Sequence, residues 1–489
     1  MTVQRTKRSP ARLLALALAA AVAACTVGPN FKRPKPPQIA GYTGPGAEAL
    51  PAAAGQHLKP VETLPSMWWR AFGSPPLDRA VELALAGSPG LETARARLAQ
   101  ALAQTAAARG AYYPQADLKA SLAREQIQGV PGRGFGPTGN VFSVGPLVSF
   151  DPDPFGRIAR GVEQQSALAE VQRYQLAAAY LSLTGNVVTE ALTIASIRAQ
   201  IAAVEEIVAV DRRNLELVQA ALQAGRSARL DVLAAESQLT SDETLLPPLR
   251  QQLSIAEHAL AVLLGKAPAE WTAPHLDLEA IALPQELPLT LPSSLVRQRP
   301  DILAAEAQLH AASAAIGVAT AQLYPDLTLS AAWTQQSGSL GTFLDPASAA
   351  WSIGASLVAP LFHGGTLEAQ RRAAVEDFNA ELAVYRQTVL QAFGQVADVL
   401  RALEHDAEFV AAERRALDTA EASLKLTQES FAAGQATFLQ VLVAQRLYQE
   451  ARLGYVRARA QRHLDTAQLY VALGGAAAEW SDALAAENR

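Results

Sequence analysis

The chain has 489 residues, of which 50% are hydrophobic and 18% charged, and its formal net charge is −5. This hydrophobic content excludes a disordered chain, and an acidic balance without a basic stripe argues against a nucleic-acid partner. The single cysteine excludes an intrachain disulfide and a cysteine-based zinc site. Abundant alanine favours closely packed helices.

The N-terminus reads as a secretory signal. A basic start precedes a short apolar run that ends in Ala24 and is too short to span a membrane as a helix. Its end resembles the bacterial lipoprotein signal, so we expect residues 1–24 to be removed and Cys25 to carry lipid such as palmitate. In bacterial lipoproteins an aspartate after the cysteine favours retention in the inner membrane. This chain has Thr26 at that position, so it resembles a lipoprotein that is sorted to the outer membrane. A plain signal peptide with an incidental cysteine is the alternative.

Prolines divide the rest of the chain. Residues 25–78 are rich in proline and should form an extended segment and an equatorial belt. Aromatic residues expected to pack in this belt are Trp68, Trp69 and Phe72. Residues 266–289 form a second proline-rich linker in the belt, and residues 475–489 form a C-terminal tail.

One structural unit occurs twice. Residues 224–233 align with residues 433–442, and both segments share a Gly…Leu-x-Val-Leu pattern. The same shift of 209 residues aligns a Leu-Gly pair at the end of each unit. We therefore expect structural repeats at 79–265 and 290–474.

Long proline-free stretches predict very long helices. Apolar residues three and four apart run from Leu176 to Val208 and resume at Leu215, as in a coiled-coil seam. Pro247 and Pro248 should kink or break the second helix of the first repeat. The expected long helices are about 158–223, 228–264, 366–433 and 437–473.

Each repeat also contains a pair of strands. Apolar and small or polar residues alternate in segments of about 115–125, 141–151, 326–336 and 350–359. Such alternation is what a strand with one lipid-facing side and one water-facing side requires. The alternative is a half-buried hairpin on a soluble sheet.

Four membrane strands cannot close a barrel, because open edges in lipid leave backbone groups unsatisfied. Two chains would supply eight strands and a filled interior, whereas three would supply twelve and room for water. Small polar residues on one face of the strands favour the open lumen.

Together these features resemble the outer-membrane efflux factor family, in its lipoprotein branch, which is NodT-like and OprM-like and more distantly TolC-like. The resemblance covers the mature chain. The residues that carry it are Cys25-Thr26-Val27-Gly28-Pro29-Asn30-Phe31, Trp68-Trp69, the two Tyr-Pro strand starts, Pro360-Leu361-Phe362 and the two Gly…Leu-x-Val-Leu segments.

The resemblance implies an α+β membrane protein that forms a homotrimer. Its duplicated helix–β-hairpin–helix unit would build a twelve-stranded barrel in the outer membrane and a long α-helical barrel in the periplasm. It would act as a passive exit duct for small molecules such as drugs, toxic compounds or metal ions. An inner-membrane pump, of the proton-driven RND type in this branch, would feed the duct through a periplasmic adaptor.

The helix–turn–helix ends resemble the family's adaptor-contacting tips. Glycine permits the left-handed turn between two helices. We expect Leu230 and Leu439 to pack the hairpins and the polar turn residues to be exposed. Ordinary tight turns are the alternative. The candidate tip residues are Gly225, Arg226, Ser227, Leu230, Gly434, Gln435, Thr437 and Leu439.

A closed tunnel needs a gate near these tips. Acidic residues repeated by three-fold symmetry would form a ring that attracts cations and resists closing. A solvated outer face is the alternative, with ion pairs such as Asp418 with Arg414 or Arg415. The candidate gate residues are Asp211, Arg212, Arg213, Asp418, Glu421 and Glu429.

No catalytic, metal or cofactor site is expected. No His-x-x-x-His pair occurs in the sequence, and the glycine-rich loop at 132–136 lacks the helix that a phosphate loop requires. Three alternative functions stay open: a type I protein-secretion duct, a non-channel periplasmic coiled-coil scaffold lipoprotein, and a lipid-anchored enzyme.

Overall fold

A computed structural model describes most of the chain as two compact units. The sheet unit comprises residues up to Pro34, Arg97–Gln172 and Ala304–Arg386, and the hairpin unit comprises the remainder. The expected signal peptide and Cys25 lie outside the described residues, as does the tail beyond residue 475. The described residues are 26–37, 39, 41–43, 55–126 and 138–475.

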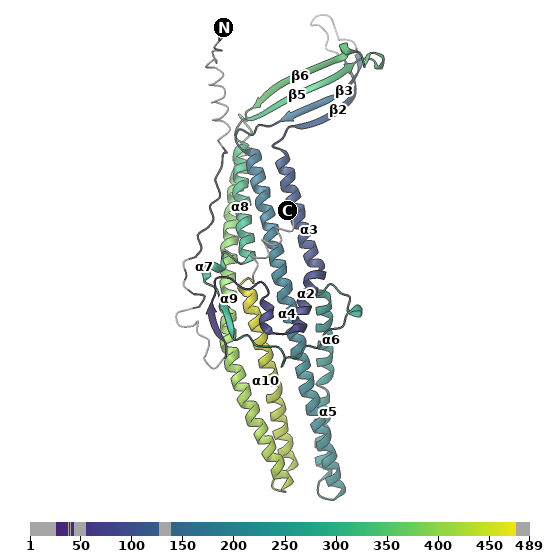
Figure 1. Ribbon diagram of the computed structural model, residues 1–489, viewed down its shortest axis with the longest axis vertical. Coiled ribbons are helices and arrows are strands. Elements are labelled where there is room, and N and C mark those ends of the chain that lie inside the picture. The colour runs from purple at the N-terminus through teal and green to yellow at the C-terminus, as the bar shows by residue number, and fades with distance from the viewer. Residues whose placement is uncertain (1–25, 38, 40, 44–54, 127–137, 476–489) are drawn as a thin grey trace, which may run out of the picture. The chain divides into compact units, whose positions relative to one another are not determined.

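The sheet unit contains a four-stranded antiparallel sheet in the order β2-β3-β5-β6 (Figure 1). Proline and glycine residues occur in the connections between this sheet and the helices, because neither residue continues a helix or strand easily. The strands are β2 (Gln115–Gln126), β3 (Thr138–Phe150), β5 (Asp326–Ser337) and β6 (Ala349–Val358).

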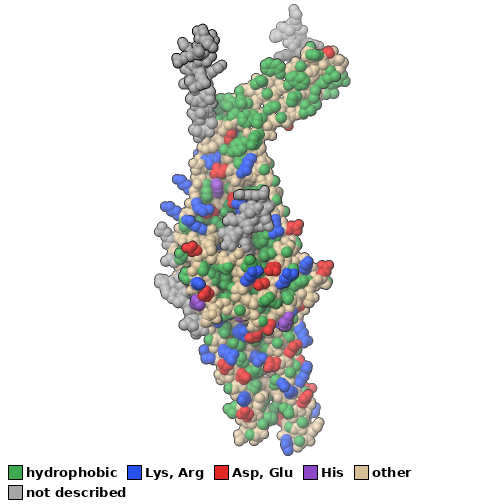
Figure 2. All heavy atoms as spheres, viewed as in Figure 1, with side chains coloured by type: hydrophobic (Ala, Val, Ile, Leu, Met, Phe, Trp, Pro, Cys, Tyr) green, Lys and Arg blue, Asp and Glu red, His purple; other side chains and the backbone are tan. Residues whose placement is uncertain are grey.

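The register places most of the large apolar residues of the four strands on one face of this sheet. Leu122 is opposite Phe142, Val148 is opposite Ala331, and Trp333 is opposite Trp351, and directly paired residues point to the same side. Figure 2 shows hydrophobic side chains spread over the sheet with few charged ones between them. The other face carries small polar groups, such as two serine hydroxyls 2.7 Å apart on β2 and β3.

The helices begin where the sequence offers proline or a cap. Proline stands at the first position of α2, α3, α7 and α8, where its missing N–H costs nothing. The shorter helices are α2 (Pro75–Gly87), α3 (Pro89–Gly110), α7 (Pro292–Leu295) and α8 (Pro300–Ala321).

Two pairs of long helices form the helical hairpins. The first return helix is broken: α5 ends at Glu243, four residues before Pro247. A proline ring clashes with the carbonyl four residues earlier, so the break lies upstream of the proline pair itself. The helices are α4 (Arg157–Gln223), α5 (Arg229–Glu243), α6 (Leu246–Leu263), α9 (Thr366–Ala432) and α10 (Phe438–Ala472).

Within the hairpin unit, the proline-rich segments pack on the helices. The short strands β1 (His57–Pro60) and β4 (Glu286–Leu289) pair in parallel. A 3-10 helix, η2 (Trp68–Phe72), buries Trp68, whose ring stacks on Tyr470 at a centroid distance of 5.3 Å. The aromatic group therefore serves packing. Further 3-10 helices are η3 (Pro268–Glu270), η4 (Leu340–Thr342) and η5 (Pro346–Ser348).

Among the described residues, α4 and α8 are long and apolar enough to cross a membrane by length and composition alone. Half of the qualifying window of α4 and 67% of that of α8 are buried inside the protein. Core helices of soluble proteins pass the same test, so this property is weak evidence for a membrane-spanning helix.

Candidate docking tips and gate

Both helical hairpins turn on a glycine with left-handed backbone. Gly225 has a φ of 68° and Gly434 a φ of 75°. The N–H of Arg226 donates to the carbonyl five residues back at 2.8 Å, and that of Gln435 does the same at 2.9 Å. This bond defines the Schellman motif, which ends a helix and satisfies its last carbonyls. The two turns therefore share one backbone geometry.

The helices that follow the turns are capped by different side chains. In the first hairpin, the Asp231 carboxylate accepts bonds from the Ser227 hydroxyl at 2.7 Å and the Ala228 N–H at 3.0 Å. In the second, the Gln440 amide oxygen accepts a bond from the Thr437 N–H at 2.7 Å, and the Thr437 hydroxyl accepts one from the Gln440 N–H at 3.4 Å. Both arrangements satisfy N–H groups that a helix start leaves free.

The expectation that Leu230 and Leu439 pack the hairpins is wrong, because they are 74% and 66% exposed. Residues two positions later lie about 200° around the helix, and Val232 and Val441 face inward instead. Of the polar turn residues, Ser227 is half-buried. The others expected at the surface are exposed: Arg226, Gln435 and Thr437.

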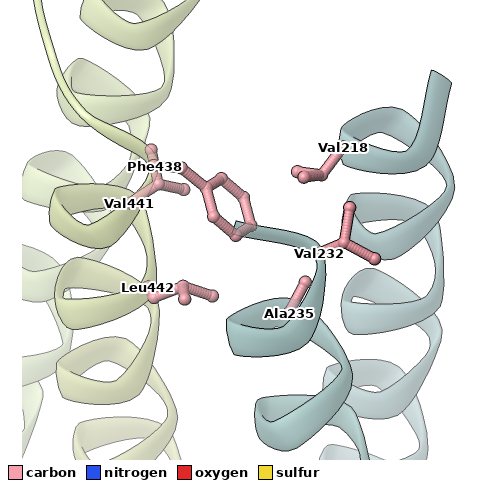
Figure 3. Close-up of a cluster of buried hydrophobic side chains, with 6 residues drawn as sticks. All are labelled: Val218, Val232, Ala235, Phe438, Val441 and Leu442. Carbon is pink, nitrogen blue, oxygen red and sulfur yellow. The ribbon is translucent and has the colours of Figure 1, made fainter. Parts of the chain in front are cut away.

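The inward residues of both hairpins form one tip cluster. Figure 3 shows the Phe438 ring pointing from α10 toward α5. The cluster joins the ends of the two hairpins through apolar contacts alone. Its members are Val218, Val232, Ala235, Phe438, Val441 and Leu442.

Asp211, a candidate gate residue, is buried within the chain and is only 3% exposed. Its carboxyl group is hydrogen-bonded to that of Asp242 on α5 and to the Gln445 amide on α10. Burial, followed by the bond to Asp242 and its charge, raises the pKa of Asp211 to about 8. Asp211 thus links three helices and does not face open space.

The other candidate gate residues lie on the surface. Arg212 pairs with Glu243 at 2.8 Å, and Asp418 pairs with Arg414 at 2.9 Å. Glu421 lines a groove of about 270 Å³ between α4, α9 and α10. Arg213 and Glu429 are exposed. The structure therefore does not gather the six residues at one place.

Sequence reasoning missed the buried acid pairs. Asp242 was not singled out, nor was a second pair, Asp406 on α9 and Asp465 on α10. Burial and then the bond to Asp465 raise the pKa of Asp406 to about 7. The signal was available: Asp211 stands at a seam position between Val208 and Leu215.

The start of the described chain is fixed to the sheet unit. The Val27 N–H donates to the Phe155 carbonyl at 3.1 Å. The Arg160 side chain, 5% exposed, donates to the Val27 carbonyl at 3.1 Å and to the Asn30 amide oxygen at 2.8 Å. Phe31 stacks on a histidine of α8 at a centroid distance of 4.5 Å. Thr26 therefore lies close to where β3 ends and α4 begins.

The paired turns and the single apolar sheet face agree with a match to a known family. A family model described as outer membrane efflux protein matches residues 80–266 and 291–475. The chain belongs to this family.

Similar proteins of the outer membrane efflux protein family extend over most of the chain. The pyoverdine export outer membrane protein OpmQ of Pseudomonas aeruginosa is 31% identical over 421 residues, which cover 83% of this chain and 87% of OpmQ. Nodulation protein T of Rhizobium leguminosarum bv. viciae is 29% identical over 473 residues, covering 95% and 93% of the two chains.

The solved structure of the outer-membrane channel OprN has the same fold, with a TM-score of 0.83 and 29% sequence identity. The match covers 92% of this chain and 99% of that chain. This protein is therefore an outer-membrane efflux channel, and its family consists of transport proteins.

Proposed function

We propose that the protein is the homotrimeric exit duct of a tripartite efflux pump. Three chains would join their sheets into a twelve-stranded barrel in the outer membrane, and their helices would form a barrel in the periplasm. The repeats 79–265 and 290–474 would be the two halves of each chain's share. Small molecules would pass outward without chemical change.

The open edges of the sheet carry this proposal. Within the described part of the chain, β2 and β6 each pair on one side only, and the apolar face that crosses all four strands includes Trp351 and Ile353, which are 76% and 78% exposed. Unpaired backbone groups are costly in lipid, so β2 of one chain needs β6 of the next. Three copies close a ring with a water-filled lumen, whereas two give a barrel whose interior side chains fill it.

The hairpin tips would receive a periplasmic adaptor, which connects the duct to an inner-membrane pump of the RND type. Exposed Leu230 and Leu439, beside exposed polar turns, offer apolar anchors at equivalent places in both hairpins. Central apolar anchors within a polar rim are typical of docking surfaces. Surface acids of α9, Asp418, Glu421 and Glu429, would contribute to the gate.

Lipid on Cys25 would assist insertion. This part of the proposal is supported by the bonds from Arg160 to Val27 and Asn30, which tie the start of the described chain to the first turn of α4. One acyl chain binds membranes only marginally, so the barrel would supply most of the anchoring. Cys25→Ser should abolish acyl labelling and leave trimers intact; labelling that persists would contradict lipidation at this residue.

Conductance of the purified protein in a planar bilayer tests the duct directly. We expect discrete channel openings from a crosslinkable trimer, and none from a scaffold lipoprotein. A deletion strain should become sensitive to toxic small molecules while still secreting its proteins. Lost protein secretion with unchanged sensitivity would instead identify a type I secretion duct.

A further inference from the structure

The carboxyl groups of Asp211 and Asp242 meet inside the hairpin unit. The residues are 3% and 7% exposed, and among the described residues no amide, hydroxyl or cationic group donates to the second oxygen of Asp211. Ionising both of these carboxyl groups would cost much free energy, because they are buried and no water screens the repulsion between their charges. One shared proton resolves the repulsion and supplies the donor for their hydrogen bond.

Amide groups surround the pair and tie it to α10. The Gln238 amide donates to Asp242 at 2.8 Å, and the Gln445 amide donates to Asp211. The oxygen of Gln445 in turn accepts from Asn214 on α4 at 2.7 Å. Gln449 is 5% exposed, and its amide nitrogen has no hydrogen-bond partner in the described part of the chain. This acid network therefore joins α4, α5 and α10 above the tip cluster.

Several charged residues near the acid network form ion pairs with one another. On α4 and α5, Arg212 pairs with Glu243 at 2.8 Å. On α6, Arg250 pairs with Glu205 at 3.0 Å. On α10, Arg452 pairs with Glu206 of α4, and Arg446 pairs with Glu450 at 3.6 Å. From α9, Glu421 and Lys425 line the groove that Gln445 and Gln449 share.

We propose that Asp211 and Asp242 form a proton-linked latch that holds the first hairpin closed on α10, and that loss of the shared proton releases it. The inference rests on the proposed channel function, since a latch near the tips would regulate the gate. The proton equilibrium of the latch itself involves only residues of this chain.

The sign of the pH effect follows from the closed geometry. Burial and the neighbouring carboxyl raise the pKa of Asp211 to about 8, well above that of an exposed aspartate. The closed state therefore binds a proton that the open state releases. Its stabilisation is complete below about pH 4 and is lost as the pH rises through about 8. Acid closes the latch and alkali opens it.

Hydrogen exchange of the intact trimer at about pH 6 and about pH 9, corrected for intrinsic rates, tests the latch. Exchange of α5 amides should rise about tenfold or more in the wild type. The Asp211→Asn/Asp242→Asn double variant keeps the shape and loses the titration, so its exchange should not change. Glu243→Gln, which removes one charge on the same helix, should behave like the wild type.

Flat exchange in the wild type, or a rise that persists in the double variant, would overturn the latch. Bilayer conductance of the same samples separates this result from the channel proposal. A protein that conducts while its α5 exchange stays flat is a channel without this latch. A protein that never conducts but shows the pH-dependent exchange refutes the duct and keeps the latch.

Discussion

The ends of the two helical hairpins share a backbone and differ in what they bury. Positions 209 residues apart are equivalent, so Ala420 and Ala451 of the second hairpin correspond to Asp211 and Asp242 of the first. Alanine fills the same helical positions without any charge to desolvate. The fold therefore does not require the acid pair. Because burying carboxyl groups costs stability, the first hairpin carries a polar group that packing alone does not explain.

The starts of α5 and α10 differ in the opposite sense, because here the second hairpin carries the distinctive buried side chain. Arg229 and Phe438 are equivalent; the arginine is exposed, whereas the phenylalanine is 6% exposed and fills the tip cluster. The second hairpin thus supplies the large apolar side chain, and the first supplies the smaller Val232 and Ala235 that receive it. Phe438 therefore acts as the anchor of the tip cluster, and Val232 and Ala235 form the surface that receives its ring.

Removing the anchor should have the largest effect. Phe438→Ala deletes a buried ring from the tip cluster and should destabilise the packed ends by about 3–5 kcal/mol. Hydrogen exchange of the first turns of α10 measures this loss. Leu439→Ala, one residue later and exposed, is the matched control. Equal losses in both variants would show that the cluster does not hold the ends together.

The turns should respond equally to one substitution. Gly225→Ala and Gly434→Ala each force a side chain into left-handed backbone and should cost about 1–2 kcal/mol. Among the described residues beyond the two chain neighbours, no atom lies within 4 Å of either added Cβ, so the cost is backbone strain alone. Gly394→Ala, in the interior of α9 with open space around it, should instead stabilise by about 0.5–1 kcal/mol.

Thermal unfolding of the three glycine variants provides the comparison. A large difference between Gly225→Ala and Gly434→Ala would mean that the turns are not equivalent in solution.

Periodicity predicted where the helices and strands run. Proline-free stretches indicated helices at about 158–223 and 366–433, and α4 and α9 span Arg157–Gln223 and Thr366–Ala432. Helix and strand periods are local, so one chain is enough to see them. The proline pair predicts a break at residues 247 and 248, and the break lies upstream of α6, because the clash acts on the preceding turn.

Side-chain direction and pairing between helices were harder. Leu230 and Leu439 looked like packing residues by type, but the phase of each helix, fixed by its cap, turns them outward. The partner of Asp211 is 31 residues away on another helix. No local pattern brings two such residues together; the seam position alone indicated that Asp211 is buried.

The caps should show a smaller difference between the hairpins. Asp231→Ala removes an acceptor of two hydrogen bonds and should destabilise α5 by about 1 kcal/mol. Thr437→Ala removes two long hydroxyl bonds to Gln440, of 3.4 and 3.2 Å, and leaves the shorter bond from the Thr437 N–H to the Gln440 amide oxygen, so about 0.5 kcal/mol is expected. Exchange of the first-turn amides in α5 and α10 measures both. A larger loss at Thr437 would reverse this ranking.

The smallest effect on stability should accompany the clearest effect on partner binding. Leu230→Ala and Leu439→Ala alter exposed side chains and should change stability by less than about 0.5 kcal/mol. If the tips receive the adaptor, each variant should still weaken adaptor crosslinking, because an apolar anchor is lost. Leu344→Ala, an 87% exposed leucine of the sheet unit, is the control. Unchanged crosslinking in both tip variants would show that the adaptor does not bind at these leucines. Loss in only one would show that the two hairpins, alike in backbone, offer the adaptor different surfaces.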